Sequence, residues 1–141
     1  MGKVMMRIKL TNSVDLGIAR RGALPAGDVR TVVVEALFDT GATTLVLPRD
    51  VCEKLGLSLE GTRSVRYANG ATAEVPWAVV RLEILGREAT FDALVQEAGT
   101  TPLIGQIPLE ALDLVVDPKN RQVSVNPASP DIPLLDILAA S

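Results

Sequence analysis

The residue with the clearest potential for chemistry is Asp39, in the stretch Leu37-Phe38-Asp39-Thr40-Gly41-Ala42. The chain contains no histidine and one cysteine, Cys52. Because Ser-His and Cys-His hydrolases and most catalytic zinc sites need histidine, those mechanisms are excluded. Cys52 falls in a predicted helix and is interpreted as a small buried apolar residue rather than a nucleophile. Carboxylate chemistry remains, with Asp39 as its candidate.

Asp39 lies between two segments that are suited to β-strands. Residues 32–34 and 37–38 are β-branched or bulky apolar residues, and residues 44–47 resume this character. The sequence therefore predicts that Asp39 follows a buried strand on a tight loop, which Thr40 and Gly41 shape. An ordinary turn is the alternative interpretation, because Asp and Gly are common turn formers.

Two further stretches have a recognisable pattern. Leu103-Ile104-Gly105 consists of two apolar residues and a glycine that permits close backbone approach, and a short helix is predicted after it at residues 108–112. Asn69-Gly70 joins two β-compatible segments, residues 62–67 and 71–77. An Asn-Gly pair in this setting is a strong hairpin signal.

Together these stretches resemble the retropepsin-like aspartic proteases, in their single-lobe bacterial or cellular branch. The resemblance runs from about Met5 to Asn126, with specific matches at residues 37–42 and 103–105 and a weaker match at the hairpin tip. It implies a mainly β fold, a single-lobe closed barrel with a flap hairpin and one or two short helices. Leu103, Ile104 and Gly105 correspond to the second signature of the family, which leads into the helix that backs the catalytic loop.

The resemblance also implies a flap, the mobile arm that closes over substrate, at Tyr67, Ala68, Asn69 and Gly70. An ordinary β-hairpin is the alternative, in which Tyr67 and Trp77 are packing residues. In both interpretations we expect Trp77 to support the base of the hairpin.

Members of this family hydrolyse peptide bonds with two carboxylates that face each other across a water and share one proton. The chain has a single Asp-Thr-Gly and no repeat long enough to supply a second lobe. The resemblance therefore implies an aspartic endopeptidase that acts on a polypeptide substrate as a homodimer, with one Asp39 from each subunit. By the same resemblance, Thr40, Gly41 and Ala42 support the catalytic loop: Thr40 bonds backbone across the interface, and Gly41 leaves space for the substrate main chain.

Three positions depart from the retroviral pattern. Retroviral members have acids just after the alanine and an arginine after the second-signature glycine, whereas this chain has Thr43, Thr44 and Gln106. The acids and the arginine of retroviral members can form an ion pair, and in this chain all three of these positions are neutral. We expect hydrogen bonds to take the place of that ion pair.

The remaining apolar segments predict a barrel of short strands. Strands are expected at residues 5–10, 29–38, 79–85, 88–95, 115–117 and 122–126, and a helix at residues 49–55. The hairpin at residues 79–95 is expected to turn across Gly86-Arg87, and its Asp92 to face the surface.

Two segments are predicted to lie outside regular structure. Residues 11–28 contain three glycines and Pro25 and are interpreted as a long hairpin connection, with Arg20-Arg21 solvated. Residues 127–141 are rich in Pro and Ala and then apolar, and we interpret them as a tail after a protease domain at residues 1–126.

The composition of the 141 residues limits the classes of function. One domain is expected, with a core of Val, Leu, Ile and Ala, since 48% of the residues are hydrophobic and 3% are aromatic. A net charge of -3 argues against nucleic-acid binding, which needs clustered Lys and Arg. The sequence has neither a transmembrane-length apolar run nor a secretory signal, so we expect no membrane contact and a cytoplasmic location. No metal and no cofactor is expected.

Two other functions remain compatible with the sequence. One is a non-catalytic dimeric module of the same fold, which holds an extended peptide by strand addition. The other is a latent protease whose apolar tail, at residues 132–138, occupies the cleft. Turnover that depends on Asp39 distinguishes the protease from the peptide-binding module, and deletion of the tail tests latency.

Overall fold

The apolar segments on both sides of Asp39 become strands of one sheet in the computed structural model, which describes residues 3–137. Nine strands, three α-helices and one 3-10 helix occur within this range. In chain order they are β1 (Val4–Thr11), α1 (Ser13–Arg20), η1 (Ala26–Asp28), β2 (Thr31–Phe38), β3 (Leu45–Pro48), α2 (Arg49–Lys54), β4 (Gly61–Arg66), β5 (Thr72–Ile84), β6 (Arg87–Gln96), β7 (Leu103–Ile104), α3 (Gln106–Ala111), β8 (Leu114–Asp117) and β9 (Gln122–Val125).

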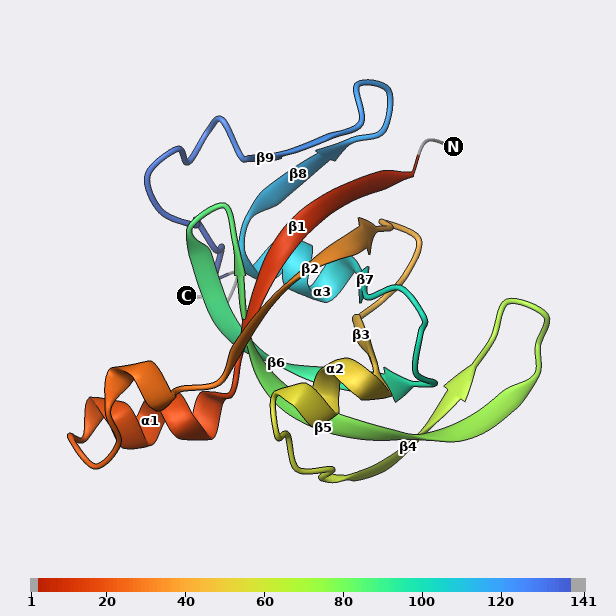
Figure 1. Ribbon diagram of the computed structural model, residues 1–141. Coiled ribbons are helices and arrows are strands. Elements are labelled where there is room, and N and C mark those ends of the chain that lie inside the picture. Colours follow the sequence, from red (N-terminus) through yellow and green to blue (C-terminus); the bar gives the residue numbers. More distant parts are fainter. Residues whose placement is uncertain (1–2, 138–141) are drawn as a thin grey trace.

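Six strands close into a mixed barrel. Their order is β1-β2-β7-β3-β6-β5, and pairing of β5 with β1 at Leu10 and its neighbours closes the ring. β2 runs parallel to β7 and β3 runs parallel to β6, while the other pairs are antiparallel. β4 pairs only with β5 and lies outside the ring, and β8 and β9 form a separate two-stranded sheet (Figure 1). The predicted mainly β closed barrel is confirmed.

The barrel encloses an aliphatic core, as the composition predicted. Along β1, Ile8 and Leu10 are buried while Arg7 and Lys9 are exposed, which is the alternation expected of a strand with one face in a core. Helix α2 covers the barrel with the buried Val51, Cys52 and Leu55 at its inner side. Each such side chain contributes about 1.5–3 kcal/mol of transfer free energy when fully buried.

Helix α1 corrects the prediction that residues 11–28 form only a hairpin connection. Asn12 caps the helix, because its side-chain oxygen accepts a hydrogen bond from Asp15 N at 3.0 Å. Its amide also donates to Leu55 O at 2.8 Å, which ties the cap to the end of α2. These contacts outweigh the low helix propensity of Gly17. The signal in the sequence was an Asn followed by an Asp at the third position after it.

The carboxylate of Asp15 fixes α1 to the start of β2. It accepts hydrogen bonds from Arg30 N at 3.1 Å, Arg30 Nε at 2.8 Å and Arg30 Nη2 at 2.9 Å. These hydrogen bonds lower the pKa of Asp15. Arg20 and Arg21 at the other end of the helix are exposed, as expected.

β5 is one continuous strand of 13 residues, where the sequence predicted two strands separated at Ala78. It pairs with β4 as far as Trp77 and with β6 from Trp77 onward. A single strand therefore carries the β4–β5 hairpin away from the barrel (Figure 1). Trp77 pairs with Gly61, the first residue of β4, and so lies at the base of the hairpin as predicted.

The β5–β6 hairpin turns at Leu85-Gly86, one residue before the predicted pair. Both turn residues have positive φ, 53° at Leu85 and 80° at Gly86. A two-residue hairpin turn of type I′ requires positive φ at both central residues. Arg87 is therefore the first residue of β6 and is buried, with only 6% of its surface exposed. Its guanidinium donates to the carbonyl oxygens of Leu112, Asp113 and Ser129.

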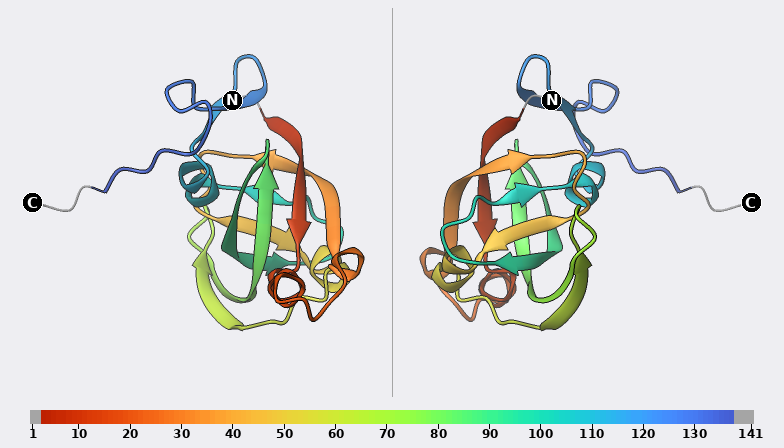
Figure 2. Two further views of the ribbon diagram at one scale, coloured as in Figure 1. Left: turned by 90° about the vertical axis from the view of Figure 1, so that its left-hand side faces the viewer. Right: turned by 90° about the vertical axis from the view of Figure 1, so that its right-hand side faces the viewer.

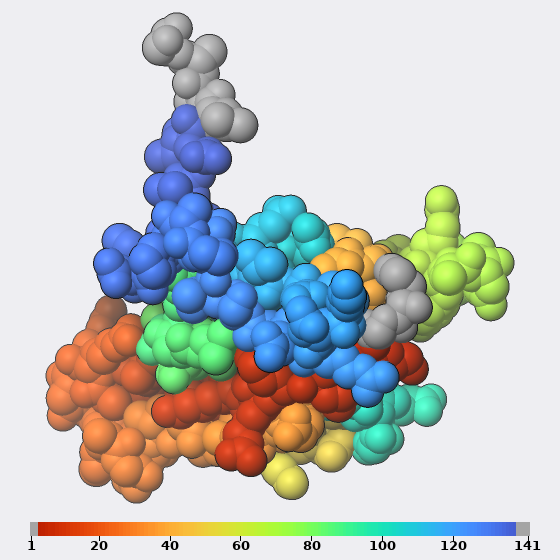
Figure 3. Space-filling view, turned by 90° about the horizontal axis from the view of Figure 1, so that it is seen from above, coloured from red at the N-terminus to blue at the C-terminus, as the bar shows by residue number. Residues whose placement is uncertain are grey.

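Residues 127–137 follow β9 outside both sheets. Ser129 is buried against Arg87 and donates to the Asp113 carboxylate, which also accepts from Leu134 N at 3.0 Å. Beyond this anchor the segment leads away from the barrel and from the β4–β5 hairpin (Figures 2 and 3). Ile132, Leu134, Leu135 and Ile137 are exposed in it. Within residues 3–137 no helix has both the length and the apolar character to cross a membrane.

Candidate active site

The backbone of the barrel places Asp39 directly after β2, with an exposed side chain. Asp39 N donates to Ile104 O at 3.0 Å, and Asp39 O accepts from Ala42 N at 3.1 Å. Gly41 N donates to Asp39 Oδ1 at 2.9 Å. The loop thus orients one carboxylate oxygen by a backbone N–H while the group stays accessible to solvent.

The second predicted segment lies directly behind this loop. Gly105 is buried and its N donates to Thr44 O at 3.0 Å, while the next two amides, of Gln106 and Ile107, donate to Ala42 O and Thr43 O at 2.8 Å. A side chain at position 105 has no room, because a Cβ there would lie 2.6 Å from Thr44 N. Two segments far apart in sequence are therefore joined by three successive hydrogen bonds.

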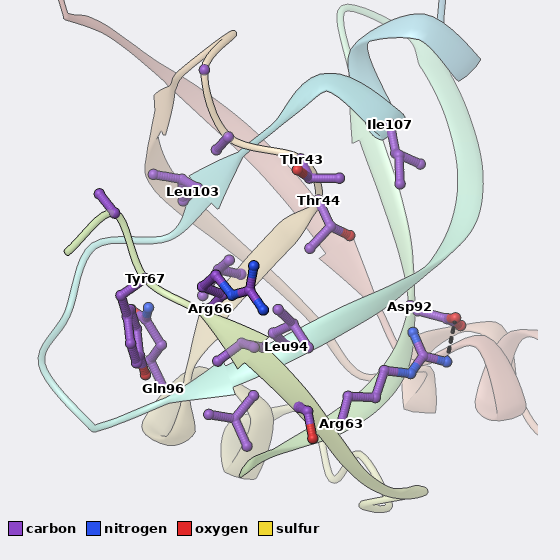
Figure 4. A pocket seen from close by; sticks show the side chains of 17 residues that line it. Thr43, Thr44, Arg63, Arg66, Tyr67, Asp92, Leu94, Gln96, Leu103 and Ile107 are labelled. Carbon is purple, nitrogen blue, oxygen red and sulfur yellow. Dashed lines mark hydrogen bonds and ion pairs between the residues drawn. The ribbon is translucent and has the colours of Figure 1, made fainter. Parts of the chain in front are cut away.

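The β4–β5 hairpin and this loop line one cavity of about 600 Å³. Gly41 and Ala42 contribute to it from the loop, and Ala68 from the hairpin. Tyr67 of the hairpin and Leu103 of the second segment also line it (Figure 4). Much of the remaining lining is aliphatic or hydroxylic. These residues are Thr43, Thr44, Val46, Ser64, Val65, Val75, Leu94 and Ile107.

The other predicted site residues lie around this cavity without lining it. Asp39 and Thr40 line a second, separate recess of about 180 Å³, together with Lys3, Leu37, Phe38, Val116 and Pro118. Asn69 and Gly70 are exposed in the turn of the hairpin, where Asn69 Oδ1 accepts from Ala71 N at 2.9 Å and Gly70 has a φ of 86°. Ile104 is buried and pairs with Phe38.

Arg63 and Arg66 line the cavity but were not among the site residues expected from the sequence. Arg63 donates to Asp92 Oδ2 at 2.9 Å, and its guanidinium carbon lies 4.0 Å from the centre of the Trp77 ring. Asp92 is exposed, as predicted, and it also lines the cavity. The available signal was a strand with two arginines that leads into the Asn-Gly turn.

The neutral side chains of Thr43, Thr44 and Gln106 are not hydrogen-bonded to one another, and the hydrogen bonds that join these two segments come from the backbone. Gln106 Nε2 donates to Glu110 Oε1 at 3.2 Å, one turn along α3. The connection between the segments is made by backbone groups of Ala42, Thr43 and Thr44. These bonds do not depend on side-chain charge, so the loop keeps its position without an acid–arginine pair.

No cluster of three or more His, Cys, Asp and Glu side chains suited to a metal ion occurs among residues 3–137. The groups that can do chemistry at the loop are the exposed Asp39 carboxylate and the hydroxyls of Thr40, Thr43 and Thr44. A carboxylate beside an open cavity can accept a proton from a water and return it to a leaving group.

A protein-family model matches the part of the chain that contains these segments. Residues 26–107, more than half of the chain, match the family model described as aspartyl protease. No protein of curated description matches the chain. The matched segment contains the Asp39 loop, the hairpin and the second signature.

Three solved structures are similar to the chain at low identity. A retropepsin-like aspartic protease from Rickettsia conorii is 17% identical, with 82% of this chain and 85% of that chain covered and a TM-score of 0.48. The EIAV protease in complex with the inhibitor HBY-793 is 22% identical, with 56% and 76% covered and a TM-score of 0.48. The protease of simian foamy virus is 18% identical, with 55% and 82% covered and a TM-score of 0.42. On the strength of the family match, the chain belongs to the aspartyl proteases.

Proposed function

We propose that the protein is an aspartic endopeptidase whose catalytic dyad consists of Asp39 from each of two identical subunits. The observation that carries the proposal is the placement of Asp39, exposed on a loop held by backbone hydrogen bonds and next to an open cavity. Among the described residues, Asp39 is the one acid that lines its recess. We assign the second carboxylate of the dyad to the Asp39 of another subunit.

The chemistry follows from two like charges held close together. Both carboxylates cannot ionise cheaply a few Å apart, so the pair retains one proton. The ionised carboxylate takes a proton from a water, and the water oxygen bonds to the scissile carbonyl carbon. The protonated carboxyl gives its proton to the carbonyl oxygen. When the C–N bond breaks, one carboxyl gives its proton to the leaving nitrogen and the other carboxylate takes a proton from a hydroxyl of the tetrahedral intermediate, so that the pair again holds one proton.

A twofold homodimer brings two copies of one loop together, because each residue at the axis meets its own copy. Asp39 and Thr40 are both exposed at the same end of the barrel, so their loop is accessible for such a contact. We assign to Thr40 a hydrogen bond to backbone across the interface. Gly41 keeps the space beside the carboxylate, since a Cβ there would lie 3.2 Å from Asp39 Oδ1.

We assign the role of a flap to the β4–β5 hairpin. β4 is attached only to β5, and the hairpin tip from Arg66 to Thr72 is exposed. Tyr67 and Ala68 already line the cavity, so a small inward movement of the tip would cover a bound peptide. An extended peptide would then lie between the hairpin and the Asp39 loops.

The direct test is cleavage of an unstructured protein mixture by the wild type and by Asp39→Asn. We expect the substitution to abolish cleavage and to leave the circular dichroism spectrum and the unfolding midpoint near those of the wild type. Asp28→Asn, an exposed acid on η1, is the matched control and should retain activity. Equal cleavage by the Asp39→Asn variant would overturn the proposal, and peptide binding without turnover would favour a peptide-binding module.

Mixing the two proteins tests whether the dyad spans two subunits. If wild type and Asp39→Asn are co-refolded in equal amounts, random pairing places half of the wild-type subunits in mixed dimers. Activity per wild-type subunit should then fall to about half. Undiminished activity, or a monomeric mass in solution under conditions of full activity, would exclude a shared dyad.

A further inference from the structure

The side chains that line the cavity carry more positive than negative charge. Its lining contains Arg63, Arg66 and Asp92. Arg63 and Asp92 form an ion pair at 2.9 Å. In the part of the chain that the structure describes, no carboxylate forms an ion pair with Arg66. One positive charge is therefore available to a ligand in the cavity.

The strand directs this charge toward the space where a peptide would lie. Arg66 is the last residue of β4 and pairs with Thr72, just before the hairpin turn. Its side chain points into the cavity, on the side of Thr44 and Leu94 (Figure 4). Glu74, on the neighbouring strand, does not line the cavity. A peptide covered by the hairpin would thus meet the guanidinium.

Six Val, Leu and Ile side chains line the same cavity: Val46, Val65, Val75, Leu94, Leu103 and Ile107. They offer contacts for aliphatic side chains and no charge that would compete for Arg66. A guanidinium is a planar fork of donors that binds a carboxylate through two parallel hydrogen bonds. The cavity therefore combines apolar contacts with one group that suits an acidic side chain.

We propose that Arg66 is a specificity-determining residue, which selects polypeptides with a Glu or Asp among aliphatic residues close to the cleaved bond. This inference rests on the proposed protease function of the same site. In a twofold dimer each subunit contributes one Arg66, so the preference occurs at one position on each side of the bond. Closure of the hairpin lowers the water content around the pair and strengthens it.

The test uses a set of peptides that contain a Glu or a Gln at one position at a time around a cleaved aliphatic pair. With the wild-type protein we expect kcat/KM to be about fivefold higher for Glu than for Gln at the responsive positions, as for an exposed ion pair of about 1 kcal/mol. Arg66→Gln should remove this difference and Arg66→Lys should keep part of it. Arg66→Glu should reverse the preference, so that the Gln peptide is cleaved faster than the Glu peptide.

Arg20→Gln is the matched control, because Arg20 is an exposed arginine on α1 and does not line the cavity. It removes the same charge and should keep the preference for Glu. Salt at about 0.5 M should weaken the preference in the wild type, since it screens exposed charges. A wild type that cleaves both peptides equally at every position, or an Arg66→Gln variant that keeps the preference, would overturn the inference.

A binding measurement separates this inference from the proposed catalysis. Asp39→Asn is titrated into fluorescently labelled Glu and Gln peptides, and anisotropy gives the two dissociation constants. Tighter binding of the Glu peptide, lost in Asp39→Asn/Arg66→Gln, supports the role of Arg66 even where the wild type shows no turnover. Equal binding of both peptides contradicts it, whereas absent cleavage by the wild type contradicts only the protease.

Discussion

Gly105 lies in backbone contact with Thr44. Its N–H donates to Thr44 O at 3.0 Å, and a Cβ at position 105 would lie 2.6 Å from both Thr44 N and Thr44 O. It would also lie 2.8 Å from Ala42 O. Because these are backbone atoms of the loop that carries Asp39, an added methyl group cannot be accommodated without moving that loop.

Gly105→Ala is therefore expected to destabilise the protein by about 1–3 kcal/mol, the range for overpacking a filled site. Urea unfolding measures the change. Cleavage activity should fall by more than the loss of folded protein explains, because the displaced loop also carries the catalytic carboxylate. An unfolding midpoint equal to that of the wild type would show that the contact can relax.

Gly17→Ala provides the comparison on α1, where no atom lies within 4 Å of the added Cβ. Alanine has a higher helix propensity than glycine, so we expect a gain of about 0.5–1 kcal/mol in the free energy of unfolding. Replacement of glycine by alanine is thus expected to raise the free energy of unfolding at position 17 and to lower it at position 105. A loss of stability at position 17 would mean that α1 tolerates no side chain there.

Asp113→Asn tests how the segment after β9 is anchored. The Asp113 carboxylate accepts hydrogen bonds from Ser129 Oγ, Leu134 N and Asn126 Nδ2, and these hold its pKa at about 2. Because this value lies below that of the unfolded chain, the stabilisation is fully present above about pH 4. It is lost as the pH falls towards 2.

The expected result is a urea midpoint for Asp113→Asn that is lower than that of the wild type at pH 5 and closer to it at pH 2. Asparagine tolerates the φ of 54° at this position, so the backbone is not a second cause. Asp28→Asn, on the exposed η1, should follow the wild type at both pH values. A constant difference between Asp113→Asn and the wild type would exclude the proton-linked anchor.

The parts of the site that could be predicted from the sequence are those set by local backbone chemistry. Asp39-Thr40-Gly41 between two apolar strands and the glycine at position 105 have few structural solutions, and the structure places them in contact. The Asn69-Gly70 hairpin followed from the positive φ that glycine permits. Each of these signals is contained in a few consecutive residues of the sequence.

The parts that were missed depend on contacts between distant segments. Besides its local cap, helix α1 is held by hydrogen bonds from Asn12 to Leu55 and from Arg30 to Asp15, and neither of these partners is local. By helix propensity alone, the glycines in residues 11–28 favour a loop. Arg63 and Arg66 lie in the β-compatible segment at residues 62–67, and only the three-dimensional structure shows that they line the same cavity as Gly41 and Ala42 of the Asp39 loop.

Cys52 should be unreactive in the folded protein. Only 3% of its surface is exposed, and burial raises the pKa of its thiol to about 11. At pH 8 the thiolate fraction is therefore small and the sulfur is shielded, so a disulfide reagent such as DTNB should react slowly without urea and quickly above the unfolding midpoint. Fast labelling of the native protein would show that α2 opens locally.

The Arg63–Asp92 pair is expected to hold the hairpin toward the barrel, because it joins β4 to β6 across β5. Both side chains are partly exposed, so a double-mutant cycle with Arg63→Gln and Asp92→Asn should give a coupling of about 0.2–1 kcal/mol that weakens with salt. Trp77 emission should shift to longer wavelength in Arg63→Gln, since the guanidinium lies over its ring. Hydrogen exchange at residues 64–73 should become faster.

Arg81 and Glu88, a similar pair within the β5–β6 hairpin, provide the matched cycle, and removing them should leave exchange at the β4–β5 hairpin unchanged. Equal acceleration in both cycles would mean that the hairpin responds to surface charge in general and is not held by Arg63.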